Sequence, residues 1–245
     1  MKITVLGSGS KGNSTLVETT SCNILIDAGL SIKNIEQRLN NPLPKIDLLI
    51  ITHTHIDHIK YINQIIKKHT PTVLTLVNDL ETKITNQITK QEEYQINNLN
   101  IKLFKLSHDV DCCGILIKEK NEELVYITDT GYLSNKVLKQ IKEKNIYIIE
   151  SNHDEEMLRN GKYPFHLQQR IRSDKGHLSN DACANYLKKI IGENTKYIVL
   201  AHLSEENNTE KIVEQTINKM LTKTPNNINK IYIAKQDKKL ETIEV

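Results

Sequence analysis

The chain has 245 residues, of which 38% are hydrophobic and 26% charged, and its net charge is +3. This length is enough for one domain with a substantial core. The net charge is small, so composition alone does not indicate a nucleic-acid partner. The four cysteines include no C-x-x-C pair, and no stretch reaches the length of a transmembrane helix. We therefore expect a cytoplasmic protein without signal peptide or membrane partner, and composition indicates no oligomeric state.

Short apolar runs recur along the chain and alternate with helical segments. In chain order, the predicted strands are 2–7, 15–18, 23–29, 46–52, 72–76, 101–108, 114–119, 123–131, 146–151, 196–204 and 230–235. Helical periodicity is expected for 57–68, 134–143, 179–191 and 208–221, with Ser179 or Asn180 as the cap of the third helix. This alternation predicts a mixed α/β protein, with a single domain over 1–245 and its helices on the outside.

Polar residues able to bind metal or transfer protons repeatedly follow an apolar strand. They are Asp27, His53, His108, Asp129, Glu150 and His202. Strand ends at one edge of a sheet are where α/β folds place their sites, so we expect these side chains to belong to one site.

The segment "THTHIDH" (52–58) supplies the densest group of metal-binding side chains, in the pattern H-x-H-x-D-H. His53 and His55 lie two positions apart, so in an extended segment they point the same way, and Asp57 and His58 lead into the following helix. One tetrahedral ion cannot use all four groups from so short a loop, whereas two neighbouring ions can. The motif therefore predicts a dinuclear centre.

With "SHD" (107–109), "TDTG" (128–131) and "AHLS" (201–204) in order behind this motif, the sequence resembles the metallo-β-lactamase superfamily over essentially its whole length. The resemblance implies a four-layer αββα sandwich with two mixed sheets flanked by helices. It also implies seven ligands for two divalent ions: His53, His55 and His108 for the first, Asp57, His58 and His202 for the second, and Asp129 as the bridge.

Four further segments, "LGSGSKGNSTLV" (6–17), "ESNHD" (150–154), "GHLSN" (176–180) and "AHLSEENN" (201–208), are similar to the YycJ/VicX (WalJ) group of that superfamily. The group is associated with metal-dependent exonuclease activity on DNA from 5′ ends. The resemblance thus implies a phosphodiesterase with a nucleic-acid substrate, DNA rather than RNA. The alternatives are a hydrolase of RNA, or of a small ester or thioester as in glyoxalase II; a third is a non-enzymatic protein with a metal-stabilised fold.

Several residues are expected to assist the metal centre. Asp27 would fix the tautomer of a ligand, and His153 would also lie behind the ligands. Glu150 would orient His177, which would meet the scissile phosphate or protonate the leaving oxygen. The remaining candidates are expected to contact substrate: Ser10 and Asn13 in the glycine-rich loop, and Arg170, Arg172 and Lys175, whose cations suit phosphate. His69 is expected at a solvated helix end.

The expected mechanism uses a hydroxide shared by the two ions as nucleophile, with Asp57 and Asp129 as catalytic carboxylates beside Glu150 and His177. Imidazole-rich sites suit zinc, but manganese and iron also accept histidine together with carboxylate. Zinc and manganese are therefore both predicted, with iron as a further option.

Overall fold

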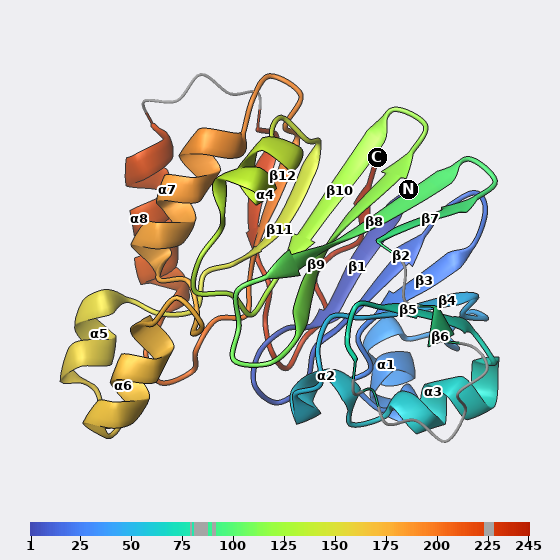
Figure 1. Cartoon of the computed structure of the whole chain (residues 1–245), viewed down its shortest axis with the longest axis horizontal. Helices are drawn as coiled ribbons and strands as arrows, with labels where there is room; N and C mark the ends of the chain where they lie inside the picture. The colour runs from blue at the N-terminus through green and yellow to red at the C-terminus, as the bar shows by residue number, and fades with distance from the viewer. Residues whose placement is uncertain (79, 81–87, 90–91, 223–227) are drawn as a thin grey trace. The chain divides into compact units, whose positions relative to one another are not determined.

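The computed structural model describes residues 1–78, 80, 88–89, 92–222 and 228–245, arranged as two mixed β-sheets with flanking helices (Figure 1). By their contacts the residues form two compact units, one of Met1–Lys105, Val110–Glu122 and Ala234–Val245, the other of Leu106–Asp109 and Glu123–Ile233. The predicted α/β class with two mixed sheets is confirmed. A single domain over 1–245 stays a prediction.

The first sheet has the order β14-β1-β2-β3-β4-β5-β6. Its strands are β1 Lys2–Gly7, β2 Ser14–Glu18, β3 Asn23–Ile26, β4 Leu48–Ile51, β5 Thr72–Thr75, β6 Ile88–Thr89 and β14 Ile243–Glu244. Strands β14, β1, β2 and β3 pair antiparallel, whereas β3, β4, β5 and β6 run parallel. The parallel strands are almost continuously aliphatic, as expected for strands with both faces covered.

The second sheet has the order β13-β12-β11-β10-β9-β8-β7. Its strands are β7 Glu93–Ile96, β8 Leu99–Leu106, β9 Cys112–Glu119, β10 Glu122–Ile127, β11 Ile146–Glu150, β12 Tyr197–Ala201 and β13 Lys230–Ile233. Strands β10 to β13 are parallel in register, with Ile127 beside Ile149 and Glu150 beside Ala201. This register brings the ends of β10, β11 and β12 to the same edge.

The helices are α1 Ile32–Leu39, α2 Ile56–Ile59, α3 Ile62–His69, α4 Asn135–Gln140, α5 Glu155–Asn160, α6 Phe165–Arg172, α7 Asn180–Ile190 and α8 Glu210–Leu221. Hydroxyl or carboxylate caps begin most of them; Ser179, for instance, accepts a hydrogen bond from the backbone N–H of Ala182. Helices α7 and α8 pack side by side over β11 and β12 (Figure 1).

The helix expected over 57–68 is divided into α2 and α3. At the division, backbone groups form hydrogen bonds with Ala28 instead of with the next turn of the helix. The carbonyl of His58 accepts a hydrogen bond from Ala28 N–H at 2.7 Å, and Tyr61 N–H donates to the Ala28 carbonyl at 2.9 Å. These bonds tie the loop after β3 to the α2–α3 segment. The short helix α2, which carries Asp57 and His58, is thereby anchored to that loop.

His69, expected at a solvated helix end, is instead buried. It is 6% exposed, and its Nδ1 accepts a hydrogen bond from the backbone N–H of Ile46 at 3.2 Å. The preceding residues of α3, Ile62, Ile65 and Ile66, are also buried and belong to a cluster with Ile35, Leu49 and Val73. The apolar stripe was visible in the sequence, but not that the last turn of the helix is covered.

Candidate metal centre

Three of the polar residues at strand ends have a left-handed backbone. Asp27, Asp129 and His202 have φ angles of 61°, 59° and 55°. Residues other than glycine seldom adopt this conformation, and it persists where the surrounding structure imposes it, commonly at functional sites. Each of these residues lies one or two positions beyond the end of its strand.

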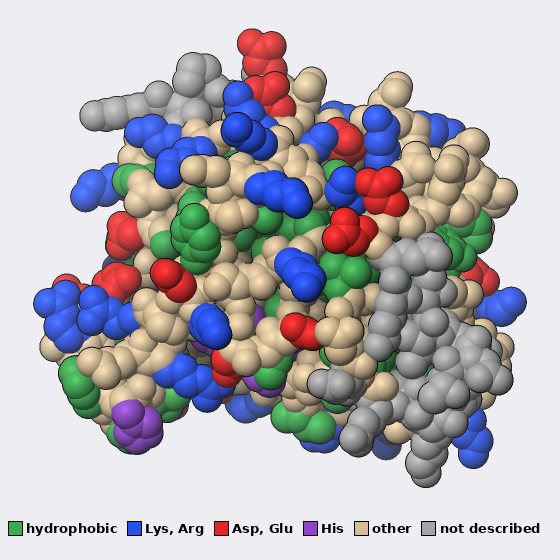
Figure 2. Space-filling view, in the orientation of Figure 1, with side chains coloured by type: hydrophobic (Ala, Val, Ile, Leu, Met, Phe, Trp, Pro, Cys, Tyr) green, Lys and Arg blue, Asp and Glu red, His purple; other side chains and the backbone are tan. Residues whose placement is uncertain are grey.

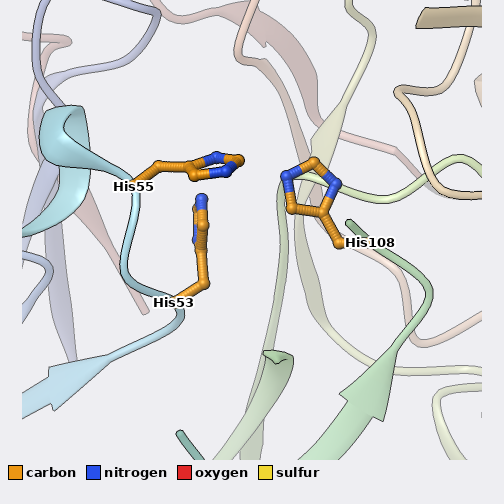
Figure 3. A group of neighbouring side chains, drawn as sticks. All are labelled: His53, His55 and His108. Carbon is orange, nitrogen blue, oxygen red and sulfur yellow. The ribbon is translucent and has the colours of Figure 1, made fainter. Parts of the chain in front are cut away.

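Four donors of the first unit come from the segment after β4. The imidazoles of His53 and His55 meet edge to face with centroids 4.7 Å apart, and those of His53 and His58 are 4.0 Å apart. His53 and His58 are fully buried, whereas Asp57 and His55 are partly exposed. Figure 3 shows the rings of His53 and His55 rising from this segment. The motif residues thus form one compact group of metal-binding nitrogens and oxygens.

Asp27 contacts Nδ1 of one of these imidazoles directly and that of a second one through the Thr52 hydroxyl. Its Oδ2 lies 2.7 Å from Nδ1 of His58, and it accepts hydrogen bonds from the hydroxyl and backbone N–H of Thr52. The Thr52 hydroxyl lies 3.0 Å from Nδ1 of His53. When that hydroxyl donates to Asp27, it can accept from His53, so both rings carry their proton on Nδ1 and their lone pair on Nε2.

The glycine-rich loop between β1 and β2 is tied to the same group. Asn13 is fully buried, and its Nδ2 lies 2.8 Å from His58 Nε2 and 3.0 Å from Asp57 Oδ2. Gly29 is required nearby, because a Cβ there would overlap the carbonyl oxygen of Asp57. Ser10 is exposed and its hydroxyl contacts the Gln236 side chain at 3.4 Å. Within the loop, Asn13 therefore belongs to the donor group and Ser10 does not.

In the second unit, Glu150 at the end of β11 contacts imidazoles at Nδ1, as Asp27 does in the first unit. Its Oε1 lies 2.7 Å from Nδ1 of His177 and 3.0 Å from Nδ1 of His202. Its Oε2 accepts from the backbone N–H groups of Thr130 and Leu178, each at 3.1 Å. The fully buried carboxylate is therefore saturated with donors, and the Nε2 atoms of both imidazoles are turned away from it.

Asp129 and His108 complete the donors of the second unit. The side chains of Asp129, Glu150, His177 and His202 each offer a ligand atom within 4.8 Å of one another. Asp129 Oδ1 lies 3.5 Å from Nε2 of His202. His108, the third ring drawn in Figure 3, follows β8 and directs Nδ1 to the carbonyl of Gly176 at 3.3 Å. Its Nε2 lies 3.2 Å from Oδ1 of Asp109.

The buried carboxylate and its imidazoles shift one another's pKa values. Burial opposes ionisation of Glu150, but attraction to His177 and hydrogen bonds from His177 and His202 outweigh it and lower the pKa of Glu150 to about 2. Burial likewise disfavours the charged form of His177, yet the pull of Glu150 raises its pKa above the usual value. His177 thus carries positive charge more readily than an ordinary histidine.

His153, expected behind the ligands, is buried, with 1% of the residue exposed. Burial lowers its pKa to about 4, so the ring is neutral near pH 7. Neither ring nitrogen has a hydrogen-bond partner among the described residues. Electrostatic interactions with Glu150 and His177 act on the ring, and the His153 backbone bridges to Ser179.

The expected phosphate-binding cations lie on and after α6, a helix that was not predicted from the sequence. Lys and Arg side chains gather over α5 and α6 (Figure 2). Arg170 forms an ion pair with Asp109, the neighbour of His108, and Arg172 pairs with Glu155 at 3.2 Å. Lys175 is exposed. Two of the three expected cations therefore already have a carboxylate partner within the protein.

Three polar residues of the centre were not predicted from the sequence. Thr52 links Asp27 to His53, Asp109 contacts both His108 and Arg170, and Asn152 donates to the carbonyl of His202 at 2.9 Å. Each lies directly beside a predicted residue or inside a quoted motif. Neighbours of a ligand in sequence are thus the signal that would have found them.

The donor chemistry suits divalent metal ions. Imidazole nitrogens together with carboxylate oxygens are the ligands of zinc, manganese and iron in proteins. A metal-binding histidine characteristically donates its other N–H to a carboxylate, a carbonyl or water, as Asp27, Glu150 and Gly176 provide for here. The residues present therefore fit such ions.

Buried imidazoles and carboxylates at the strand ends of two mixed sheets define a metal-dependent hydrolase. A profile of the β-lactamase superfamily domain matches residues 22–203, and the chain belongs to that superfamily. It is 34% identical over 232 residues to the exodeoxyribonuclease WalJ of Streptococcus pneumoniae, covering 88% of this chain and 86% of that protein. It is also 34% identical over 235 residues to the exodeoxyribonuclease YycJ of Bacillus anthracis, covering 90% and 89%.

Solved structures share the fold at lower identity. The metallo-β-lactamase fold protein YhfI of Bacillus subtilis superposes with a TM-score of 0.72 at 18% identity, covering 98% of each chain. A diphosphatase of the PhnP family superposes with a TM-score of 0.66 at 16% identity, covering 98% of this chain and 97% of that one. Among the described residues, no helix is long and apolar enough to cross a membrane.

Proposed function

We propose that the chain is a metal-dependent phosphodiesterase that removes nucleotides from the 5′ ends of DNA. The observation that carries this proposal is the pair of buried carboxylates, Asp27 and Glu150, that hold imidazoles by Nδ1 and leave their Nε2 atoms for metal. This arrangement occurs in a chain 34% identical, over most of its length, to proteins named as exodeoxyribonucleases. Those relatives support DNA as the substrate.

In this proposal two ions, zinc or manganese with iron as a further option, share seven ligands. Donors gathered within each unit support the assignment: His53, His55, Asp57 and His58 in the first, and Asp129, Glu150, His177 and His202 in the second. By the resemblance described above, His53, His55 and His108 would hold one ion, Asp57, His58 and His202 would hold the other, and Asp129 would be shared by both. When bound, such ions would lower the pKa of water toward neutrality and so would supply the nucleophile for attack on phosphorus.

The protein's own groups orient the phosphodiester and manage charge. His177 is the more accessible imidazole on Glu150, with a side chain 22% exposed, and its raised pKa favours the cation. We assign it to the phosphate, where it stabilises negative charge or gives a proton to the leaving oxygen. Its Nδ1 stays on Glu150, so the proton for transfer is that on Nε2.

The cations near α6 would contact the nucleic-acid backbone. Lys175 lies two positions before His177 and is exposed, so it can meet a neighbouring phosphate directly. Arg170 and Arg172 must exchange Asp109 and Glu155 for phosphate oxygens to do the same. Such contacts position the strand without reading its sequence.

The test incubates the purified protein with DNA and RNA, single- and double-stranded, labelled at the 5′ or the 3′ end, in zinc and in manganese. We expect mononucleotides to appear first from the 5′ label of DNA, and no product after chelation. His58→Ala should lose at least 100-fold in rate, whereas the exposed His166→Ala should not change. Cleavage of RNA alone, internal cuts only, or activity unaffected by a chelator would each contradict the proposal.

A further inference from the structure

We infer that Asn13 is a positioning residue of the metal centre. Its amide N–H keeps a hydrogen bond to the carboxylate of Asp57, and its contact with Nε2 of His58 is replaced when that nitrogen binds a metal ion. The inference rests on the metal centre assigned under the proposed function. Asn13 is fully buried, and its Nδ2 lies 3.0 Å from Asp57 Oδ2 and 2.8 Å from His58 Nε2. Both neighbours are proposed ligands, although Asn13 lies more than 40 residues earlier in the chain.

The orientation of the Asn13 amide is set by Gly9. Its Oδ1 accepts the backbone N–H of Gly9 at 2.8 Å, and its Nδ2 lies 3.0 Å from the carbonyl oxygen of Gly9. A flipped amide would bring two donors together at the first contact and two acceptors together at the second. The nitrogen therefore faces Asp57 and His58.

The amide has one acceptor more than it has hydrogens. Its two N–H bonds face three acceptors, namely the carbonyl of Gly9, Oδ2 of Asp57 and Nε2 of His58. Nδ1 of His58 faces Asp27 at 2.7 Å, so Nε2 carries the only lone pair of that ring. A metal ion and an N–H of Asn13 compete for that lone pair.

A metal ion on His58 leaves Asn13 fully bonded. Both N–H groups then keep an acceptor, one on Gly9 and one on Asp57. No buried donor is stranded, so the exchange avoids the penalty of an unsatisfied polar group. Meanwhile Asp57 retains a donor that fixes the direction of its carboxylate. The gain in metal affinity from an oriented Asp57 carboxylate is therefore larger than the loss from competition for Nε2 of His58. Asn13 thus strengthens metal binding.

The loop that carries Asn13 is anchored separately on its outer side, which provides a matched control. Gln236 Oε1 accepts the backbone N–H of Lys11 at 2.8 Å and the hydroxyl of Ser10 at 3.4 Å. Gln236→Ala therefore loosens the same loop while leaving the contacts of Asn13 with Asp57 and His58. Comparison with Asn13→Ala separates ligand orientation from loop order.

The experiment titrates zinc into metal-free wild type, Asn13→Ala and Gln236→Ala by calorimetry, with a chelator competing for the tighter event. We expect two binding events in the wild type. Asn13→Ala should weaken one of them by about 10- to 100-fold, as loss of a group behind a metal ligand does. The other event, and both events in Gln236→Ala, should stay within about twofold.

Three results would overturn the inference. Asn13→Ala could bind zinc as tightly as the wild type or more tightly, which would make the amide only a competitor. Gln236→Ala could weaken zinc to the same degree, which would make loop order the cause. A wild type that binds no zinc or manganese would overturn the proposed metal centre together with this inference, whereas the first two results leave that centre intact.

A measurement on the wild type needs no variant and covers the case in which Asn13→Ala does not fold. On addition of zinc, the ¹⁵N resonance of His58 Nε2 should move to a metal-bound position. The side-chain N–H protons of Asn13 should stay slow in exchange with water. If zinc instead makes them exchange as fast as those of the exposed Asn34, Asn13 has released Asp57 and the inference is wrong.

Discussion

Asp27 Oδ2 lies 2.7 Å from Nδ1 of His58, and both side chains are fully buried. The same carboxylate reaches His53 through the Thr52 hydroxyl. Glu150 repeats the arrangement in the second unit with His177 and His202. A buried carboxylate that accepts from Nδ1 of an imidazole fixes that ring in the tautomer that offers Nε2.

Asp27→Asn should weaken metal binding by about 10- to 100-fold, because the amide carries no charge and one of its two positions no longer accepts. The ring of His58, and that of His53 through Thr52, would lose a defined tautomer. Zinc release to a fluorescent chelator measures the effect. Asp181→Asn, an exposed change in the first turn of α7, is the control. Equal zinc release from wild type and Asp27→Asn would refute this role.

Glu150→Gln should reduce the rate of DNA hydrolysis by at least about 100-fold and lower the melting temperature. The glutamine amide would face N–H groups where the carboxylate now accepts from His177, His202 and two backbone donors. Removing one member of a buried charged pair costs about 3–5 kcal/mol. Nucleotide release and thermal unfolding are the measurements, with the exposed Glu156→Gln as control. Wild-type rate and stability in Glu150→Gln would contradict the assignment.

Gly29→Ala should destabilise the protein by about 3 kcal/mol, at the upper end of what overpacking costs. The added Cβ would overlap the Asp57 carbonyl oxygen and would crowd the backbone of Asn13, and neither can move without disturbing the donor group. Gly192→Ala is the matched control, because its Cβ meets only the side chain of the exposed Glu143. Chemical unfolding compares the two variants, and equal midpoints would show that the close approach is not needed.

The buried His69 should make stability depend on pH. Burial lowers its pKa, so the unfolded chain binds a proton more readily than the folded one below about pH 6.5. Above that pH, the ring is neutral in both the folded and the unfolded chain, and the protein has its full free energy of unfolding. As the pH falls toward the pKa of His69 in the folded state, the free energy of unfolding decreases by up to about 1.4 kcal/mol per pH unit.

The measurement is the free energy of unfolding of metal-free protein between pH 7.5 and pH 5.5, about the window set by these pKa values. The wild type should lose stability more steeply than His69→Gln, whose side chain does not titrate. His166→Gln, on the exposed face of α6, should follow the wild type. Parallel curves for wild type and His69→Gln would show that His69 does not titrate on unfolding.

Periodicity predicted most of the strands and four helical segments, but it missed α1, although Ile32 and Ile35 of that helix are buried. The strand expected at 2–7 is β1 to the residue, and those expected around Asp27, Asp129 and His202 are also present. Helix α6 was missed because none of its residues is buried, so it has no apolar stripe to recognise. The division between α2 and α3 was missed because it depends on hydrogen bonds to Ala28, some 30 residues away in sequence.

The sequence by itself determined which donors this protein has and that each follows a strand, because strand periodicity and the H-x-H-x-D-H motif are local properties. Only the tertiary structure decided which carboxylate holds which imidazole. Parallel pairing of Ile26 with Ile50 carries Asp27 to Thr52 and His58, and pairing of Glu150 with Ala201 carries it to His202. Such contacts depend on strand order and register, which join residues far apart in the chain and leave no local pattern behind.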